Sequence, residues 1–371
     1  MKAPQDVVVR GAGIVGMSLS LLLARQGLRV ILVGSVAPPA RADVRAYAIN
    51  HAGRQTLMDA GGWPDDTTAA TPVQRMRVFG DGSGSLRFDA PAADDLTWIV
   101  DVPVVVARLQ AAVHAQPLIE VVSPEAAEAA EFDAALTVIS EGRDSSSRTQ
   151  LGTEVIARRY GHDALATRVI ADHPHQGVAW QWFDGQSILG LLPMGGEGGR
   201  ELGVVWSQAP QHAAFWRGQE VQALSEALSS ASHHALGRLH VHAPVATWPL
   251  VLTRATRWVA PGVALAGDAA HTVHPLAGQG LNLGLADVAA LAALIAQRDY
   301  WRSPGDWKLL RRYERARALP TRTVQQGIDA LYLLFDSEWP VAAPLRNWGM
   351  ALFDRLPMLK RTAMAQARAG D

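Results

Sequence analysis

The chain has 371 residues, of which 49% are hydrophobic and 19% charged, as in folded proteins with a sizeable core and room for two domains. Its net charge of −1 excludes a general electrostatic attraction to nucleic acid or to an anionic membrane. The lack of cysteine excludes disulfides, iron–sulfur clusters and thiol catalysis. Because the first six residues lead directly into an apolar segment, we expect no signal peptide and a location in the cytoplasm.

The first predicted elements form a βαβ unit. Residues 7–9 are all valine and end at a glycine-rich turn, which predicts a buried parallel strand. Leucines at helical spacing predict a helix over 17–25 that ends at Gly27. The apolar run 28–33 predicts the second strand, so the glycines lie at the first turn of the unit.

This turn has the glycine spacing of a dinucleotide-binding loop. Gly11 permits the tight turn, Gly13 lets the backbone approach a pyrophosphate, and Gly16 allows close contact between helix and strand. The free N–H groups and the dipole at the start of the helix favour phosphate. We therefore predict that the pyrophosphate is bound by Gly11, Gly13, Ile14, Val15 and Gly16.

Two positions depart from the pattern of such loops. The second strand is expected to end in an acid that binds the adenosine ribose, but Val33 is followed by Gly34. Arg10 occupies the last position of the first strand, where an apolar residue is usual. Its side chain either extends into solvent or reaches the pyrophosphate.

The middle of the chain predicts antiparallel strands. Residues 75–79 and 86–88 flank Asp81-Gly82-Ser83-Gly84, which is a strong hairpin signal. Residues 177–194 and 203–207 alternate apolar and polar side chains and contain several tryptophans. The nucleotide-binding unit is therefore interrupted by strands and returns after about residue 250, and the pattern is helical from Tyr300 onward.

Two further glycine-rich segments follow predicted strands. Ser140-Glu141-Gly142 ends the strand 135–139 and by itself indicates only a polar loop. Asp268 follows the apolar run 263–266, where its carboxylate can accept a hydrogen bond from a ribityl hydroxyl. The small residues of 274–282 would let backbone N–H groups lie beside a flat ring at the start of the next helix. Together with the first turn, these segments indicate a flavin.

Other kinds of site find little support. His271 and His274 are three residues apart, but no third ligand stands at the spacing of a metal site, so we predict no metal. No serine lies in a Gly-x-Ser-x-Gly elbow. The apolar run 285–296 is too short to span a bilayer and contains Asp287. These two features predict a buried helix.

The chain resembles the ubiquinone-biosynthesis hydroxylases, which belong to the FAD monooxygenases similar to para-hydroxybenzoate hydroxylase. The resemblance runs nearly from end to end, and Glu141 stands where the family motif Asp-Gly-x-x-Ser-x-x-Arg has aspartate. The segments that carry it are 43–46, 141–148, 160–165, 179–183, 191–193, 205–207, 267–282, 313–317 and 345–349.

The resemblance implies an α/β fold with a Rossmann-like FAD-binding domain, an inserted antiparallel-sheet substrate domain and C-terminal helices. We assign residues 1–72, 101–165 and 250–330 to the first, 73–100 and 166–249 to the second, and 331–371 to the third. It also implies cofactor contacts at Arg45, Gly142, Asp268, Gly280, Leu281 and Asn282, with Arg108 about one position from the family's helix arginine. The loop expected at the flavin face contains Pro275, Gly278, Gln279 and Gly280, and the substrate wall is assigned to Trp180, Phe183, Leu192 and Pro275.

The implied activity is hydroxylation of the aromatic ring of a prenylated phenol in ubiquinone biosynthesis. FAD would be reduced by NAD(P)H as a transient partner and would react with O2 to a C4a-hydroperoxide. The implied partners are a ubiquinone-biosynthesis protein complex and the periphery of the inner membrane. Two alternatives stay open: hydroxylation of a small soluble phenol, for which a narrow polar pocket with an arginine would argue, and a non-catalytic assembly component, for which Gly34 argues.

Overall fold

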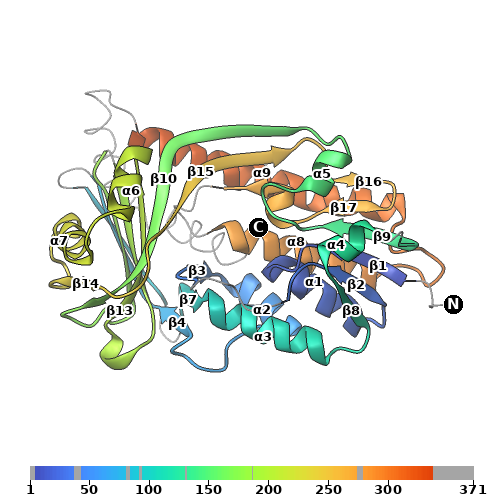
Figure 1. Ribbon diagram of the computed structural model, residues 1–371, viewed down its shortest axis with the longest axis horizontal. Coiled ribbons are helices and arrows are strands. Elements are labelled where there is room, and N and C mark those ends of the chain that lie inside the picture. Colours follow the sequence, from blue (N-terminus) through green and yellow to red (C-terminus); the bar gives the residue numbers. More distant parts are fainter. Residues whose placement is uncertain are drawn as a thin grey trace.

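The computed structural model describes residues 5–36, 43–80, 84–91, 94–129, 132–185, 187–273 and 279–336. Two sheets of different construction lie at opposite ends of the molecule, and a small third sheet lies between them (Figure 1). The predicted α/β fold with an inserted antiparallel sheet is confirmed.

The first sheet has six strands in the order β16-β17-β9-β1-β2-β8. All neighbouring pairs are parallel except β16 with β17. The strands are β1 (Gln5–Arg10), β2 (Val30–Val33), β8 (Ile119–Val122), β9 (Ala134–Ile139), β16 (Val259–Ala260) and β17 (Val263–Leu265). One face packs against α1 (Ile14–Arg25), α3 (Val102–Ala115) and α8 (Gln279–Ala296), and α4 (Pro124–Glu128) lies against the other.

The valine run of β1 shows why this sheet is buried on both faces. Val7 and Val9 are fully buried in the main core with the helices, whereas Val8 packs on the opposite face with Ile31 and Ala127. Side chains alternate between the faces of a strand, so a run of apolar residues without alternation needs cover on both sides. The prediction of a buried parallel strand followed from this pattern.

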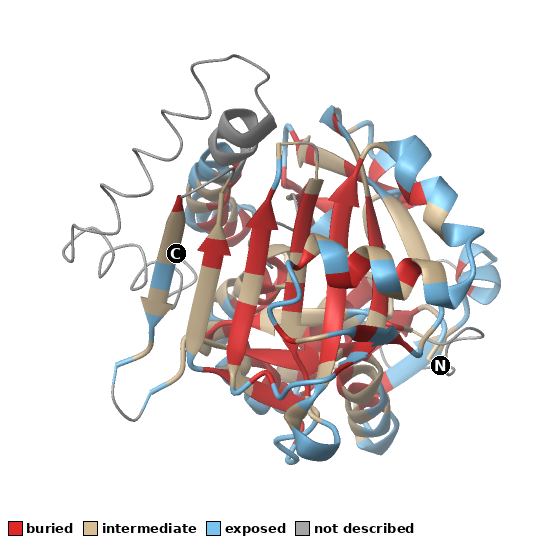
Figure 2. Cartoon of the chain, turned by 90° about the vertical axis from the view of Figure 1, so that its left-hand side faces the viewer, coloured by how far each residue is buried: buried red, intermediate tan, exposed pale blue. Residues whose placement is uncertain are grey.

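The second sheet has nine strands and is mostly antiparallel. Its order is β18-β15-β10-β13-β12-β11-β5-β6, with β14 paired to β10. The strands are β5 (Arg75–Phe79), β6 (Ser85–Asp89), β10 (Val155–Ala171), β11 (Val178–Phe183), β12 (Ser187–Pro193), β13 (Glu201–Gln208), β14 (Leu239–Val241), β15 (Ala246–Ala255) and β18 (His271–Thr272). Helices α6 (Pro210–Arg217) and α7 (Val221–Ala231) cover its outer face, and its central strands are largely buried (Figure 2).

A three-stranded sheet lies between these two sheets. It contains β3 (Ala46–Ile49), β7 (Thr97–Asp101) and β4 (Ala70–Val73), in the order β3-β7-β4, and α2 (His51–Ala60) follows β3. Ala46 and Ala48 of β3 pack with Leu192 and Met194 of the nine-stranded sheet. The inner face of the large sheet therefore turns toward the nucleotide-binding half of the molecule.

Two long strands join the halves. β10 pairs with β15 from Val155 to Ala166, and a register shift occurs between Arg159 and Asp163. The proposed domain boundaries at 165/166 and 249/250 both fall inside these strands. The two halves are thus connected by continuous β-structure (Figure 1).

The C-terminal part begins with α9 (Trp307–Asp336), which packs against α8. The proposed helical segment 331–371 is described only as far as residue 336, where it continues α9, and the rest lies outside the described residues. Within the described part, α8 alone has the length and hydropathy of a membrane-spanning helix, and half of it is buried in the protein. That burial, together with fully buried Asp287, agrees with the predicted core helix.

Candidate functional site

The glycine-rich turn lies at the C-terminal edge of the six-stranded sheet. A Cβ at Gly11 would lie 2.4 Å from the carbonyl oxygen of Ser140, and one at Gly16 would lie 1.8 Å from that of Gly11. A Cβ at Gly13, by contrast, would meet no atom of the described residues within 4 Å. Gly13 is also the N-cap of α1, and no described side chain caps this helix. The turn is therefore tightly packed at Gly11 and Gly16 and open at Gly13. The N–H groups at the start of the helix are free there to bind phosphate.

Ser140 supports the turn, although the sequence did not identify it as a site residue. Its N–H donates to the carbonyl of Arg10 at 2.7 Å, and its hydroxyl donates to the carbonyls of Arg10 and Gly11 at 3.0 and 3.2 Å. The first residue of the second glycine-rich segment is thus hydrogen-bonded to the first segment.

The structure explains why position 34 has no acid. Gly34 has φ +152°, and a Cβ there would lie 2.6 Å from the Cβ of Ala12 and 2.8 Å from its backbone nitrogen. Any side chain at position 34 would collide with the glycine-rich turn. Arg10 is half-buried on the neighbouring strand, and we find no ion pair for it among the described residues.

We expect Gly34→Glu to lower stability by about 1–3 kcal/mol and not to tighten FAD binding, because the new Cβ overlaps Ala12. Thermal unfolding and titration with FAD would measure both effects. The double variant Ala12→Gly/Gly34→Glu removes the contact between the two Cβ atoms and should recover part of the loss. Tighter FAD binding by the single variant would show that only the missing acid matters at this position.

The second glycine-rich segment folds on itself. The Glu141 carboxylate accepts from the Ser145 hydroxyl at 2.7 Å and from the Ser147 hydroxyl and N–H at 2.6 and 3.1 Å. It thereby caps α5 (Ser146–Gln150), the role expected of an acid at a helix start. Gly142 has φ +89°, and a Cβ there would meet no atom of the described residues within 4 Å. The structure therefore leaves Gly142 accessible, while the Glu141 side chain is used internally.

Arg148 connects this segment to the third one. Its guanidinium donates to the carbonyl of Ala269 at 2.9 Å and to that of Arg143 at 2.7 Å. Ala269 ends a single 3-10 turn, Gly267–Ala269, that carries Asp268. The three glycine-rich segments, which are far apart in the sequence, are thus hydrogen-bonded to one another in series.

A buried ionic cluster holds the turn Gly267–Ala269 from behind. One oxygen of Asp287 accepts from the N–H of Gly267 at 2.9 Å and contacts Nε2 of His271 at 2.6 Å. The other oxygen accepts from Nε of Arg317 at 2.9 Å. Burial would raise the pKa of the fully buried Asp287, but His271, Arg317 and the Gly267 N–H together lower it. Asp287 is therefore ionised at neutral pH.

Asp268 is the exposed residue of this turn, between buried Gly267 and Ala269. Desolvation by the surrounding protein nevertheless raises its pKa, an effect that His271, Arg143 and Arg45 oppose. The structure therefore brings the predicted residues Asp268 and Arg45 into one electrostatic environment.

Arg45 directly precedes β3, and its guanidinium pairs with a carboxylate. Its guanidinium donates to Asp43 at 2.6 and 2.9 Å and lies near the hydroxyl of Tyr47 at 3.5 Å. Burial would raise the pKa of Asp43, but the hydrogen bonds and the charge of Arg45 lower it. The pKa of Tyr47 is raised by burial, and Asp268 contributes to that rise. These groups form the polar side of the site.

The side chain of Asn282, at the start of α8, connects three elements. The side-chain oxygen of Asn282 accepts from the N–H of Asn50 at 3.0 Å, and its amide donates to the carbonyl of Ala48 at 2.8 Å. Asn282 therefore clamps β3 and α2 to α8. Gln279, Gly280 and Leu281 are the half-buried first residues of that helix, whereas Pro275 and Gly278 lie outside the described residues.

The predicted substrate wall is divided between the two faces of the large sheet. Trp180 lies on the outer face, stacked with Phe79 and Trp182 at 6.0 and 5.8 Å between ring centroids. Leu192 lies on the inner face and packs with β3. Phe183 is buried near the sheet edge with Val78 and Ile188. Trp180 pairs across the strands with Leu191, and Leu192 is the next residue. Because successive residues of a strand point to opposite faces, Trp180 and Leu192 lie on different faces of the sheet.

Sequence reasoning missed a polar group on the inner face. Ser207 pairs with Ile188 and Ala164 in the sheet, is 2% exposed, and its hydroxyl has no partner among the described residues. The neighbouring Trp206 points to the outer face, where its indole donates to Ser187 at 3.1 Å. The segment 205–207 was noted only for its resemblance, and a single sequence could not show which face is inner.

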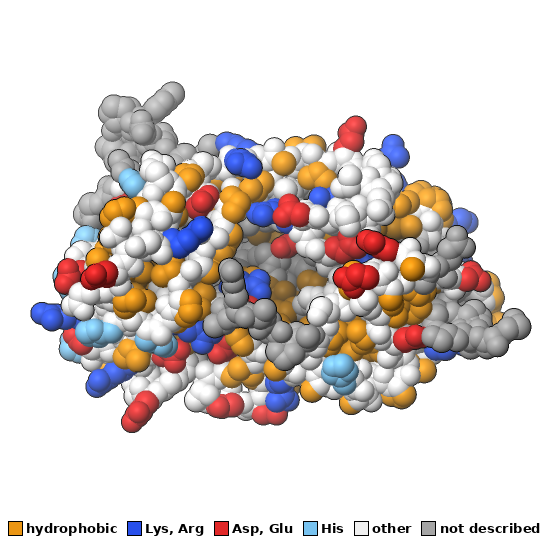
Figure 3. Space-filling view, viewed as in Figure 1, with side chains coloured by type: hydrophobic (Ala, Val, Ile, Leu, Met, Phe, Trp, Pro, Cys, Tyr) orange, Lys and Arg blue, Asp and Glu red, His pale blue; other side chains and the backbone are white. Residues whose placement is uncertain are grey.

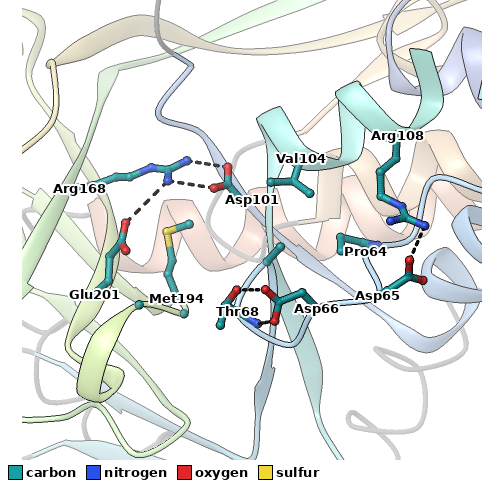
Figure 4. Close-up of a pocket in the computed structure, with 13 residues that line it drawn as sticks. Pro64, Asp65, Asp66, Thr68, Asp101, Val104, Arg108, Arg168, Met194 and Glu201 are labelled. Atoms are coloured by element: carbon teal, nitrogen blue, oxygen red, sulfur yellow. Dashed lines mark hydrogen bonds and ion pairs between the residues drawn. The ribbon is translucent and has the colours of Figure 1, made fainter. Parts of the chain in front are cut away.

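Arg108 lines a polar cavity and pairs there with a carboxylate. The cavity has a volume of about 400 Å³ and lies between α3 and the large sheet, and Arg108 pairs with Asp65 at 2.9 Å (Figure 4). Across the cavity Arg168 pairs with Asp101 at 2.7 Å and with Glu201 at 3.7 Å. Both guanidinium groups are thus already neutralised by carboxylates. The space-filling view shows a hollow near the centre of the molecule (Figure 3).

This arrangement of three linked glycine-rich segments agrees with the match of residues 106–327 to the family described as FAD binding domain. The chain belongs to this family. The matched range includes Gly142, Asp268 and α8 but starts after the turn with Gly11, so Arg10 and Gly34 lie outside it. FAD, the predicted cofactor, is confirmed at the level of the family.

Curated relatives extend the similarity to almost the whole chain. The chain is 29% identical to the 3-demethoxyubiquinol 3-hydroxylase of Escherichia coli, covering 98% of both chains. It is 29% identical to the ubiquinone hydroxylase UbiL of Rhodospirillum rubrum and 27% identical to the ubiquinone biosynthesis monooxygenase COQ6 of Xenopus tropicalis. These alignments cover 98% of this chain, and 89% and 93% of the relatives. The predicted resemblance, and with it the prediction of an FAD-dependent monooxygenase, is confirmed.

Solved structures show the same fold. PqsL, a probable FAD-dependent monooxygenase of Pseudomonas aeruginosa, superposes with a TM-score of 0.76 at 22% identity, covering 94% of this chain and all of that one. The p-nitrophenol 4-monooxygenase PnpA of Pseudomonas putida also gives 0.76, at 17% identity, covering 99% and 98%.

Proposed function

We propose that the chain hydroxylates the aromatic ring of a prenylated phenol in ubiquinone biosynthesis, with FAD, NAD(P)H and O2. The proposal rests above all on the similarity to ubiquinone-pathway hydroxylases over 98% of the chain. The fold adds a site at the edge where parallel sheets bind ligands, next to the inner face of a large antiparallel sheet.

The residues at this edge fit FAD. Gly13 and the uncapped start of α1 offer N–H groups in open space for the pyrophosphate, with Ile14, Val15 and the close-packed Gly11 and Gly16 shaping the turn. Gly142 leaves room beside it. Asp268 offers an exposed carboxylate for a ribityl hydroxyl, and Arg45 lies on the same side. We assign Asn282 a supporting role through Ala48 and Asn50.

The protein's part in the reaction is to orient and to exclude water. FAD, once reduced by NAD(P)H, supplies the activation of O2 that oxygenates the ring. Leu192 and the surrounding apolar inner face would hold the ring. A phenol activates its own ring, so no dedicated protein base is required. Burial of the inner face keeps water away from the reacting atoms.

Two observations bear on the alternatives. A narrow polar pocket with an arginine would favour a small soluble phenol, and in the polar cavity Arg108 and Arg168 are each paired with carboxylates. An assembly role was supported by Gly34, whose lack of a side chain now has a packing reason at Ala12.

The first experiment is the visible spectrum of the purified protein with and without added FAD. We expect the two absorption bands of oxidised flavin, and their decay on addition of NADH or NADPH in the presence of a prenylated phenol. A folded protein that stays colourless at high FAD would contradict the proposal. A flavoprotein that turns over only short-chain phenols would favour the soluble-phenol alternative.

A further inference from the structure

Tyr47 lies in β3, next to two groups that the proposed function assigns to FAD binding. Its hydroxyl is 3.5 Å from a guanidinium nitrogen of Arg45, and that guanidinium lies 6.0 Å from the centroid of the Tyr47 ring. The phenol also interacts electrostatically with the carboxylates of Asp268 and Asp43. Tyr47 is therefore close to both Arg45 and Asp268, although these two residues are far apart in the sequence.

The register of β3 determines the face on which Tyr47 lies. Tyr47 pairs with Val100 of β7, and its neighbours Ala46 and Ala48 pack against the inner face of the nine-stranded sheet. Successive residues of a strand point to opposite faces, so the Tyr47 side chain points away from that sheet. Its ring is half-buried and packs on the main core of the nucleotide-binding half. Tyr47 thus lies on the nucleotide-binding side of β3.

The surroundings of Tyr47 keep its phenol neutral. Burial raises the pKa of Tyr47, and the nearby charges of Asp268 and Asp43 add to this rise, whereas the charge of Arg45 opposes it. A neutral phenol donates and accepts hydrogen bonds, and its ring presents flat apolar faces. A flavin ring has two flat faces and a polar edge, so a neutral tyrosine is well suited to contact it.

We propose that Tyr47 contacts the flavin ring of bound FAD. This inference rests on the proposed function, in which the pyrophosphate lies at Gly13 and a ribityl hydroxyl at Asp268. The flavin ring is attached directly to the ribityl chain, so a ribityl hydroxyl at Asp268 brings the ring within reach of the side chains around it. Tyr47 supplies an aromatic ring at this place, and Arg45 holds its hydroxyl.

The fluorescence of bound flavin reports such a contact directly. A tyrosine that touches the flavin ring quenches its emission, because the phenol donates an electron to the excited flavin and then recovers it. The ring of phenylalanine is much harder to oxidise and does not quench in this way. The emission of bound FAD therefore distinguishes direct contact with Tyr47 from an effect that Tyr47 exerts only through Arg45.

The test compares the full-length parent with Tyr47→Phe and Tyr47→Leu, each with FAD bound. We expect weak emission from FAD in the parent and several-fold stronger emission in both variants. Tyr47→Phe keeps a flat ring and should bind FAD within about threefold of the parent, whereas Tyr47→Leu should bind it about tenfold more weakly. The control Tyr300→Phe changes a tyrosine that is 93% exposed, and it should match the parent in both emission and affinity.

Equal emission from bound FAD in the parent and in both Tyr47 variants, whether bright or weak, would overturn the proposal. Weaker FAD binding with unchanged emission would also overturn it, since Tyr47 would then act only by holding Arg45. Melting temperatures close to that of the parent would show that the variants are folded. A folded parent that binds no FAD would overturn the proposed function as well, whereas equal emission from bound FAD contradicts only the role of Tyr47.

Discussion

Asp287→Ala is expected to destabilise the fold by about 3–5 kcal/mol and to abolish FAD binding. The change removes the acceptor of the Gly267 N–H and of His271, and it leaves the buried guanidinium of Arg317 without its partner. The turn that carries Asp268 then loses its support from behind. Chemical denaturation and titration with FAD would measure the two effects.

The matched control is Asp89→Ala, which removes an exposed carboxylate that pairs with Arg77, and which should cost less than about 1 kcal/mol. Asp287→Asn keeps the shape but removes the charge. Because the folded pKa of Asp287 lies below its unfolded value of about 3.9, its contribution is complete above that pH and is lost as pH falls through the folded pKa. The free energy of unfolding of Asp287→Asn should therefore lack this pH-dependent contribution. An alanine variant with parental stability would refute the role of the cluster.

Gly16→Ala is expected to yield a protein that cannot form the glycine-rich turn. The new methyl group would lie 1.8 Å from the carbonyl oxygen of Gly11, which is backbone fixed in turn by Ser140. Relief requires α1 to move away from β1 and so to disrupt the main core, at a cost of several kcal/mol (about 3 or more). Circular dichroism during heating would show a large fall in the melting temperature.

Gly13→Ala provides the comparison, because a Cβ there meets no atom of the described residues within 4 Å. We expect this variant to melt like the parent and to bind FAD about tenfold or more weakly, since the methyl group projects into the space proposed for the pyrophosphate. Unchanged affinity for FAD in Gly13→Ala would place the phosphates elsewhere. A stable Gly16→Ala would mean that the turn can relax in a way the structure does not suggest.

Local patterns in the sequence predicted the elements around the first turn well. The valines of β1, the glycine spacing and the leucines of α1 each specify local geometry, and the structure has β1, α1 and β2 in that order. The antiparallel strands around 177–194 and 203–207 also followed from alternation. The resemblance supplied the identity of the cofactor.

Contacts between distant segments were beyond the reach of local patterns. Asp287 was noted only as a charge within an apolar run, and nothing in the sequence pairs it with Arg317, which lies 30 residues further along. Trp180 was assigned to the substrate wall, but only the packing of β3 against Leu192 shows which face of the sheet is inner. Arg108 was assigned by proximity to a family position, whereas one step along a helix turns a side chain by about 100° and here directs it toward Asp65.

The shared strands β10 and β15 also constrain how such a protein can change over evolution or by design. Many multidomain enzymes acquire new specificity when a whole domain is exchanged through a loop. Here the large sheet cannot be exchanged in that way, because two of its strands continue into the nucleotide-binding half and pair there with each other. A chimera cut at residues 165 and 250 would sever hydrogen-bonded strands. We therefore expect substitutions on the inner face to be a safer way to change the substrate than exchange of the whole sheet.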